Sequence, residues 1–228
     1  MFGIKRYEML LEEISLNNCE FSTEWTQETN PNTIFLRHDI DFSIQDALII
    51  AEKEKKLGVK STFFFMLTSN MYNIFSSLNQ ERINQIINME HKVSIHFDPT
   101  AHLSLDPFLD EKIIFEKTFN INVDIVSIHR PGIFLKNNNQ NLFDVPHTYQ
   151  DRYFKNMRYI SDSGGEDIQS KLNNYFADDS RVGLHLLLHP IWWTHQSPDP
   201  TSTLKRWISN QNDFFNSETE LNCRAFKR

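Results

Sequence analysis

The chain has only two cysteines in 228 residues, Cys19 and Cys223. Two cysteines near opposite ends cannot build a disulfide framework, so we expect free thiols and a reducing compartment. No apolar run approaches the roughly 18 residues of a membrane span. The N-terminal stretch carries charges from Lys5 onward and has no apolar core of signal-peptide length. The sequence therefore predicts a cytoplasmic protein with no membrane span.

The chain also lacks an excess of positive charge and several well-known motifs. It carries 30 acidic against 23 basic residues, a formal charge of -7, and no clustered basic patch. This composition argues against a nucleic-acid partner. We find no Gly-x-Gly-x-x-Gly, no Gly-x-x-x-x-Gly-Lys, no Gly-x-Ser-x-Gly, no His-Glu-x-x-His and no Cys-x-x-Cys. The sequence therefore does not support assignment to the common nucleotide-binding, serine-hydrolase, metalloprotease or dithiol classes that these motifs define.

What is present is an alternation of short apolar runs with amphipathic stretches. This alternation predicts an α/β fold with a parallel sheet. The expected strands cover 33–38, 61–67, 92–97, 124–129, 158–161 and 182–188. The expected helices cover 4–16, 44–57, 78–89, 107–119, a stretch between the last two strands, and 201–215. A capping box at Ser43 and Asp46 should start the second helix, and Gly58 should end it.

The chain shows no internal repeat and no linker, so we expect a single catalytic domain over 1–228. Within it, 1–32 form an N-terminal helix and polar lead-in, and 33–193 form the core that carries the motifs. Residues 194–228 form a C-terminal helix and tail. The polar loop 136–150 is long enough to be a lid or substrate loop.

Polar side chains end five of the apolar runs. Because the C-terminal ends of parallel strands share one face, these side chains should gather into one site. A cluster of carboxylates, histidines and an arginine is typical of a metal-dependent hydrolase. The residues concerned are Asp39, Asp41, His96, His129, Arg130, Asp162 and His189.

Asp39 and Asp41 should point the same way, because side chains alternate along a strand. One could bind a metal while the other accepts a proton from water. The competing interpretation is structural: one aspartate caps the following helix and the other pairs with Arg37. Arg130 likewise could contact an anionic group or form a structural salt bridge.

Four histidines need separate treatment. His96 ends a strand and is a candidate ligand, whereas His91 lies at a corner where a hydrogen bond to a loop carbonyl is expected. His189 precedes two tryptophans, 192 and 193, so it could protonate a leaving group beside rings that pack on a sugar; a buried core histidine is the alternative. His185 should be structural. Asp162 could orient a histidine, bind a hydroxyl or serve as a turn residue.

Taken in order, these motifs resemble the polysaccharide deacetylase, or NodB-homology, family from about Thr33 to Trp193. The first motif, Arg37-His38-Asp39-Ile40-Asp41, is similar to a divergent branch that accompanies genes for bacterial surface polysaccharides, including O-antigen and lipopolysaccharide. The resemblance implies a distorted (β/α) barrel and metal-assisted hydrolysis of an N-acetyl group on a sugar.

The resemblance also implies residue roles. Asp39 matches the general base, Arg130 the arginine that orients it, and His189 the general acid, which Asp162 supports. Asp41 and His96 match metal ligands.

At the position of the family's second ligand histidine this chain has Thr100. The third ligand must therefore come from elsewhere. His129 is our choice because it ends a neighbouring strand; His102 and Asp98 are alternatives. Such a site suits Zn²⁺ foremost, and also Co²⁺, Ni²⁺ or Fe²⁺.

The expected substrate is an acetamido sugar, free or carried on a nucleotide. Alternatives are an N-formyl sugar or a cyclic amide hydrolysed by the same site, and a sugar-binding protein that has lost the metal. An iron oxygenase with two histidines and one carboxylate is a more remote alternative. The sequence does not indicate an oligomeric state.

Overall fold

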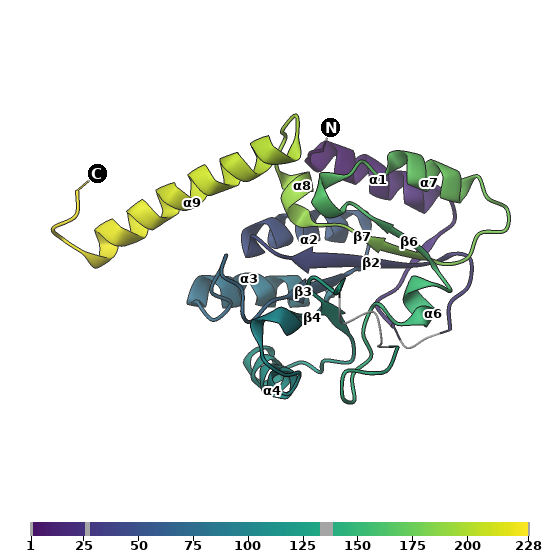
Figure 1. Ribbon diagram of the computed structural model, residues 1–228. Helices are drawn as coiled ribbons and strands as arrows, with labels where there is room; N and C mark the ends of the chain where they lie inside the picture. The colour runs from purple at the N-terminus through teal and green to yellow at the C-terminus, as the bar shows by residue number, and fades with distance from the viewer. Residues whose placement is uncertain (1, 26–27, 133–138, 228) are drawn as a thin grey trace.

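The computed structural model describes residues 2–25, 28–132 and 139–227. At its centre is a seven-stranded sheet in which every pair of neighbours runs parallel. The sheet curls, and helices surround it (Figure 1). The predicted α/β class and distorted (β/α) barrel are confirmed. The strands are β1 (Glu20–Phe21), β2 (Thr33–Ile40), β3 (Thr62–Phe65), β4 (Lys92–Phe97), β5 (Val126–Ile128), β6 (Arg158–Ser161) and β7 (Leu184–Leu187).

The order across the sheet is β5-β4-β3-β2-β7-β6, with β1 beside the start of β2. The last strand in the chain, β7, thus lies between β2 and β6. The helices are α1 (Ile4–Leu16), α2 (Ile44–Leu57), α3 (Ser77–Asn88), α4 (Pro107–Phe119), α6 (Asp151–Phe154), α7 (Gln169–Phe176), α8 (Pro190–Thr194) and α9 (Pro200–Asn222), with short 3₁₀ turns η1 (Pro99–Ala101) and η2 (Ser163–Gly165).

Helix α2 begins and ends as its sequence predicts. The Ser43 hydroxyl accepts a hydrogen bond from the backbone N–H of Asp46, 3.1 Å away, which satisfies one of the free N–H groups of the first turn. Gly58 follows the last turn with φ +70°, a left-handed conformation that glycine adopts without a Cβ clash. The direction of α2 beneath β2 is therefore fixed at both ends.

The predicted bounds of 92–97, 107–119 and 158–161 agree with β4, α4 and β6. The largest difference is the last helix, which runs to Asn222 instead of ending at residue 215. Only Thr203 and Trp207 of this helix are buried. Beyond its second turn the helix has no buried face. The sequence there carries no amphipathic pattern from which the end of the helix could be predicted.

The two faces of the sheet differ. The outer face packs against the helices in the main hydrophobic core. The inner face is filled near the start of the strands by a smaller aromatic-rich cluster of Trp25, Phe35, Phe64, Ile125, Tyr153 and Met157. Alternation along β2 places Arg37 and Asp39 on the same face as Phe35. The inner face thus changes from apolar to charged toward the C-terminal ends of the strands.

Part of the loop predicted over 136–150 lies outside the described residues. The described part, from 139 onward, is not wholly exposed. The N–H of Val126 donates to the Pro146 carbonyl (3.0 Å), and the N–H of Thr148 donates to the Val126 carbonyl (2.9 Å). Residues 145–148 are buried. Val126 and His147 form an isolated parallel bridge beside β5, and the lid role remains a prediction.

Helix α9 extends away from the rest of the molecule (Figure 1). Within the described ranges, every helix is too short or too polar to cross a lipid bilayer. Cys19 and Cys223 are free thiols, as predicted.

Candidate active site

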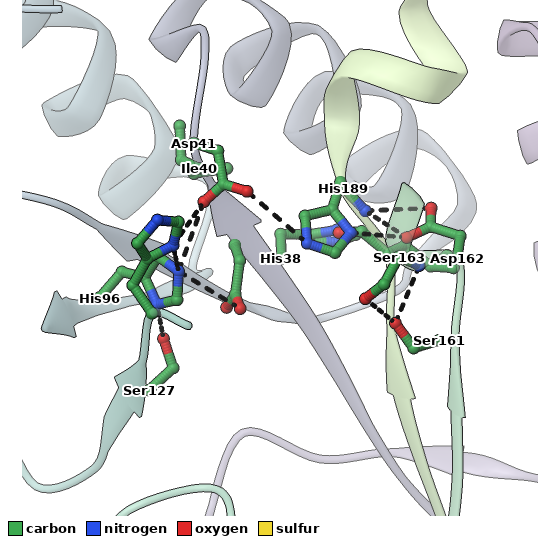
Figure 2. A network of polar contacts seen from close by, with 12 residues as sticks. His38, Ile40, Asp41, His96, Ser127, Ser161, Asp162, Ser163 and His189 are labelled. Atoms are coloured by element: carbon green, nitrogen blue, oxygen red, sulfur yellow. Dashed lines mark hydrogen bonds and ion pairs between the residues drawn. The ribbon is translucent and has the colours of Figure 1, made fainter. Parts of the chain in front are cut away.

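The C-terminal ends of five strands bring polar residues from distant parts of the sequence together. Asp41 follows β2, His96 lies on β4, and His129 follows β5. Asp162 and His189 follow β6 and β7 and lie on the other side of Asp41 (Figure 2). The clustering that the sequence predicts at this edge of the sheet is thus observed for these five residues.

Asp41, His96 and His129 form a group with the geometry of a metal site. One possible ligand atom from each residue lies within 4.8 Å of the others. Oδ1 of Asp41 is 3.3 Å from Nε2 of His96 and 3.5 Å from Nδ1 of His129, and the two ring nitrogens are 3.1 Å apart. Among the described residues, this buried carboxylate oxygen has no hydrogen-bond partner. Two imidazoles and one carboxylate that converge in this way suit a divalent transition metal.

Ser127 is a residue that the sequence analysis did not single out. Its hydroxyl lies 2.6 Å from Nδ1 of His96. If Nδ1 donates to this hydroxyl, Nε2 keeps its lone pair toward Asp41 and His129, because a neutral imidazole carries only one N–H. The register that pairs His96 with Ser127 across β4 and β5 creates this contact, and no local sequence pattern reveals it.

The two alternatives for the third ligand have other partners. Nε2 of His102 lies 2.9 Å from a Glu111 carboxylate oxygen. Asp98 caps η1 by accepting hydrogen bonds from the backbone N–H and the hydroxyl of Thr100. The fold therefore brings His129, and not His102 or Asp98, to Asp41.

Asp39 is held by the arginine two residues before it. Nε of Arg37 donates to Oδ1 at 2.8 Å, and Nη2 donates to Oδ2 at 2.6 Å. Burial opposes ionisation of Asp39, but the guanidinium and the nearby His96 and His189 outweigh it and lower its pKa to about 2. Asp39 is therefore a carboxylate at neutral pH, with Oδ2 3.6 Å from Nε2 of His96.

The structure thus gives Asp39 a different arginine from the one that the family resemblance implied. Arg130 is exposed, with φ +46° directly after β5. Burial opposes ionisation of Asp98, but its hydrogen bonds from Thr100, then His129 and, least of all, Arg130 outweigh it and lower the pKa of Asp98. Arg37 is fully buried and also contacts Tyr149 through its guanidinium. The structural pairing that we weighed for Arg37 is therefore present, whereas Ser43 and not Asp41 caps α2.

His189 is paired with Asp162. Nδ1 of His189 lies 2.6 Å from Oδ1 of Asp162, and the same carboxylate accepts hydrogen bonds from the His189 backbone N–H and from Trp193 Nε1. Burial disfavours the charged ring, but Asp162, Asp41 and Asp39 outweigh it and raise its pKa to about 9. Nε2 lies 3.9 Å from Oδ2 of Asp41, so the protonated edge faces the metal group. Asp162 thus orients a histidine, which is one of the three roles that the sequence left open for it.

The expectation that tryptophans form a sugar-binding wall beside His189 is wrong. Trp192 and Trp193 are only 6% and 3% exposed. Trp193 packs edge-on against Phe2 and near Tyr7 in the core. The Trp193 ring therefore packs α8 against Phe2 and α1, and both rings are buried instead of forming an open wall beside His189.

Two further histidines have structural roles, as expected, although His91 contacts a carbonyl of α2 and not the loop carbonyl that the sequence predicts. Nε2 of His91 contacts the Ala51 carbonyl at 3.1 Å. His185 is buried between the rings of Trp25 and Tyr159, and its Nδ1 contacts the Tyr153 carbonyl at 3.2 Å. Burial lowers the pKa of His185 to about 3, so this ring is neutral at neutral pH.

Comparisons with known proteins give similarity in structure only. No protein-family model matches the chain, and no curated protein matches it significantly. The chain is similar to the chitin deacetylase of the fungal pathogen Colletotrichum lindemuthianum, with 15% identity, a TM-score of 0.48, and 83% of this chain and 86% of that chain covered. It is also similar to a family 4 acetyl xylan esterase from Clostridium thermocellum in complex with a cobalt ion, with 14% identity, a TM-score of 0.45, and 79% and 83% covered.

A third similar structure is that of BA3943 from Bacillus anthracis, a CE4 family pseudoenzyme, with 16% identity, a TM-score of 0.44, and 79% and 60% covered. A mutant of BA3943 with restored enzymatic activity gives 17% identity and a TM-score of 0.46, with 79% of this chain covered. The chain spans only 62% of the length of that mutant protein. At these identities the similarity is one of overall fold.

Proposed function

We propose that this chain is a metal-dependent hydrolase that removes an N-acetyl or related N-acyl group from a sugar or nucleotide-sugar. One observation carries the proposal: the Asp41, His96 and His129 group lies beside a carboxylate paired with arginine and beside a histidine paired with Asp162. A metal group, a base and an acid are the three parts that hydrolysis of an amide requires. The order of motifs supports assignment to a divergent branch of the polysaccharide deacetylase family.

The donor set fits a divalent metal, with Zn²⁺ preferred and Co²⁺, Ni²⁺ or Fe²⁺ as substitutes. Asp41, His96 and His129 would hold it, leaving further coordination positions for water and substrate. When bound, the metal would polarise the amide carbonyl and make a bound water more acidic.

Asp39 is proposed as the general base. Its low pKa keeps it ionised, and its bidentate contact with Arg37 fixes the plane of the carboxylate. Arg37, and not Arg130, is therefore proposed as the arginine that orients the base. Oδ2 would accept the proton from the attacking water.

His189 is proposed as the general acid. The leaving nitrogen of an amide must gain a proton before the C–N bond breaks, and a ring with a pKa of about 9 holds that proton at neutral pH. Asp162 fixes the ring so that Nε2 faces the reacting groups. The Asp162 carboxylate also stabilises the positive charge of the His189 ring before the ring gives up its proton.

We further propose that the substrate is a small activated sugar in the cytoplasm, used for bacterial surface polysaccharides. Free Cys19 and Cys223 are consistent with a reducing compartment. The described parts of 1–228 are proposed to act as a single catalytic domain.

Metal analysis tests the centre of this proposal. Protein purified without chelator should contain about one metal ion per chain. Asp41→Ala and His96→Ala should lose it, whereas His102→Ala should keep it, because His102 pairs with Glu111 outside the metal group. Acetate release from N-acetylated nucleotide-sugars should follow metal content. Release of formate from N-formyl sugars, without release of acetate, would show that the acyl group removed is formyl and not acetyl. No metal bound after adding Zn²⁺, Co²⁺, Ni²⁺ or anaerobic Fe²⁺ would overturn the hydrolase and favour a sugar-binding protein.

A further inference from the structure

A buried polar cluster lies on the outer face of the sheet, opposite the candidate active site. Its members are Tyr7 on α1, His38 on β2, Glu54 on α2, Ser61 before β3 and His91 before β4. Four of them are 0% exposed and His91 is 5% exposed. Such a group is expensive to bury, so its contacts must be complete and its position closely defined.

Glu54 is the centre of this cluster. Its Oε1 accepts hydrogen bonds from the Tyr7 hydroxyl and from Nε2 of His38 at 2.8 Å, and its Oε2 accepts one from the Ser61 hydroxyl at 2.6 Å. Burial opposes the charge of Glu54, but His38, His91 and the Ser61 hydroxyl outweigh it and lower its pKa. The carboxylate therefore acts as an acceptor that holds one edge of the His38 ring.

The other edge of the His38 ring contacts the segment that follows β7 and leads to His189. Nδ1 lies 2.9 Å from the carbonyl oxygen of Leu188, a residue 150 positions away in sequence. A carbonyl oxygen and a carboxylate oxygen both only accept hydrogen bonds, so Nδ1 and Nε2 must both donate and the His38 ring is an imidazolium paired with Glu54. The N–H of Leu188 donates to the Arg37 carbonyl at 2.9 Å. Adjacent residues of β2 thus hold both the N–H and the C=O of Leu188.

This arrangement constrains His189. The Leu188 carbonyl belongs to the peptide bond whose nitrogen is that of His189, and this nitrogen donates to Asp162. The plane of that peptide is therefore fixed by His38 on one side and Asp162 on the other. Because the peptide is planar, its orientation sets where the His189 side chain begins.

We propose that His38 is a positioning residue for His189, and that Glu54 orients the His38 ring for this task. His38 lies on β2, the same strand that carries Asp39. Its contact with Leu188 therefore ties the backbone before His189 to that strand, and so helps to fix the distance between the proposed acid, His189, and the proposed base, Asp39. This inference rests on the proposed role of His189 as proton donor. His38 touches no reacting group, since it lies on the opposite face of β2.

Two substitutions of His38 distinguish a role in positioning His189 from a role in stabilising the fold alone. His38→Asn places an amide N–H near the position of Nδ1 and keeps a donor for the Leu188 carbonyl. His38→Gln places its amide near the position of Nε2 and keeps the contact with Glu54 instead. Each variant removes one of the two hydrogen bonds, so a purely structural role predicts similar activity losses. Positioning predicts a selective loss in His38→Gln.

The expected result is a fall in kcat of about 10- to 100-fold in His38→Gln with little change in KM, since small misplacement of a reacting group has effects of this size. His38→Asn should retain most of the kcat, and both should retain bound Zn²⁺. The ring ¹⁵N signals of His189 should shift in His38→Gln and stay in place in His38→Asn. Equal activity losses together with unmoved His189 signals in both variants would overturn the proposal.

A measurement on the unaltered protein keeps the inference testable if neither variant folds. Histidine-labelled protein should show a slowly exchanging proton on Nδ1 of His38, with the ¹⁵N shift of a hydrogen-bonded donor. An unprotonated Nδ1 would overturn the proposal outright. The ring spectra need no substrate, so failure of the proposed function would appear separately, as absence of hydrolysis by the unaltered protein.

Discussion

Arg37 and Asp39 lie two residues apart on β2 and are joined by two hydrogen bonds of 2.8 and 2.6 Å, both inside the barrel. Both side chains are almost inaccessible, with 0% and 4% exposed. A pair buried in this way is costly to break, because the remaining charge has no solvent to stabilise it.

Replacing Arg37 by Gln should therefore destabilise the protein by about 3–5 kcal/mol. The pKa of Asp39 should rise, so the acid limb of the pH profile of hydrolysis should move to higher pH. Chemical denaturation and a pH profile would measure both effects. Arg130→Gln is the matched control, since Arg130 is exposed; it should leave stability and the acid limb in place. If Arg130→Gln moved the acid limb and Arg37→Gln did not, Arg130 would be the arginine that orients Asp39.

The pH profile should also have an alkaline limb from His189. The ring must be protonated to act as an acid, and its raised pKa keeps the proton until about pH 9. Hydrolysis should therefore persist below that pH and fall as pH rises through it. Asp162→Asn removes the negative charge that contributes most to raising the pKa, so the limb should move toward lower pH. An unchanged limb in this variant would show that another group titrates.

Ser127→Ala should weaken metal binding without abolishing it. The hydroxyl contacts the His96 nitrogen that faces away from the metal group, and loss of such a contact lowers metal affinity about 10- to 100-fold. Competition with a chelator would measure the change. Ser94→Ala is the control, because the Ser94 hydroxyl bonds the Ile125 carbonyl instead of a ligand. Equal affinity losses in the two variants would indicate general disruption of β4.

His185 should make the fold sensitive to acid. Its pKa is about 3 in the folded protein, below the ordinary value of 6.5, so the unfolded chain binds a proton that the folded chain does not. Between these values stability should fall by about 1.4 kcal/mol for each unit that pH decreases. Denaturation at a series of pH values would measure the slope. His185→Phe should have a shallower slope; an identical one would assign the sensitivity to other groups.

Much of the site could be predicted from local sequence. A strand that ends in Arg-His-Asp-x-Asp, and histidines that follow other strands, identify one face of a parallel sheet, since strand direction fixes where those residues lie. Ser43 and Gly58 likewise mark the ends of α2 through short-range hydrogen bonds. These features depend on a few consecutive residues.

Other features depend on pairing across the fold. That Ser127 contacts His96 follows from the register of β4 and β5, and that His38 meets Glu54 and Leu188 follows from the packing of α2 and β7 on β2. Arg130 matched a family motif in sequence, yet its backbone turns it to the surface. Short-range patterns of residue type do not reveal which side chains become neighbours in the folded chain.

The place of β7 in the sheet has a consequence for the order of folding. Among the described strands, β6 pairs only with β7, and β7 is the last strand to be synthesised. The segment with Asp162 therefore has no strand to join until residues 184–187 have paired with β2. During translation, β2 to β5 can assemble first and bring Asp41, His96 and His129 together. The acid half of the site should form only after His189 has left the ribosome, so metal binding should precede catalytic competence in the growing chain.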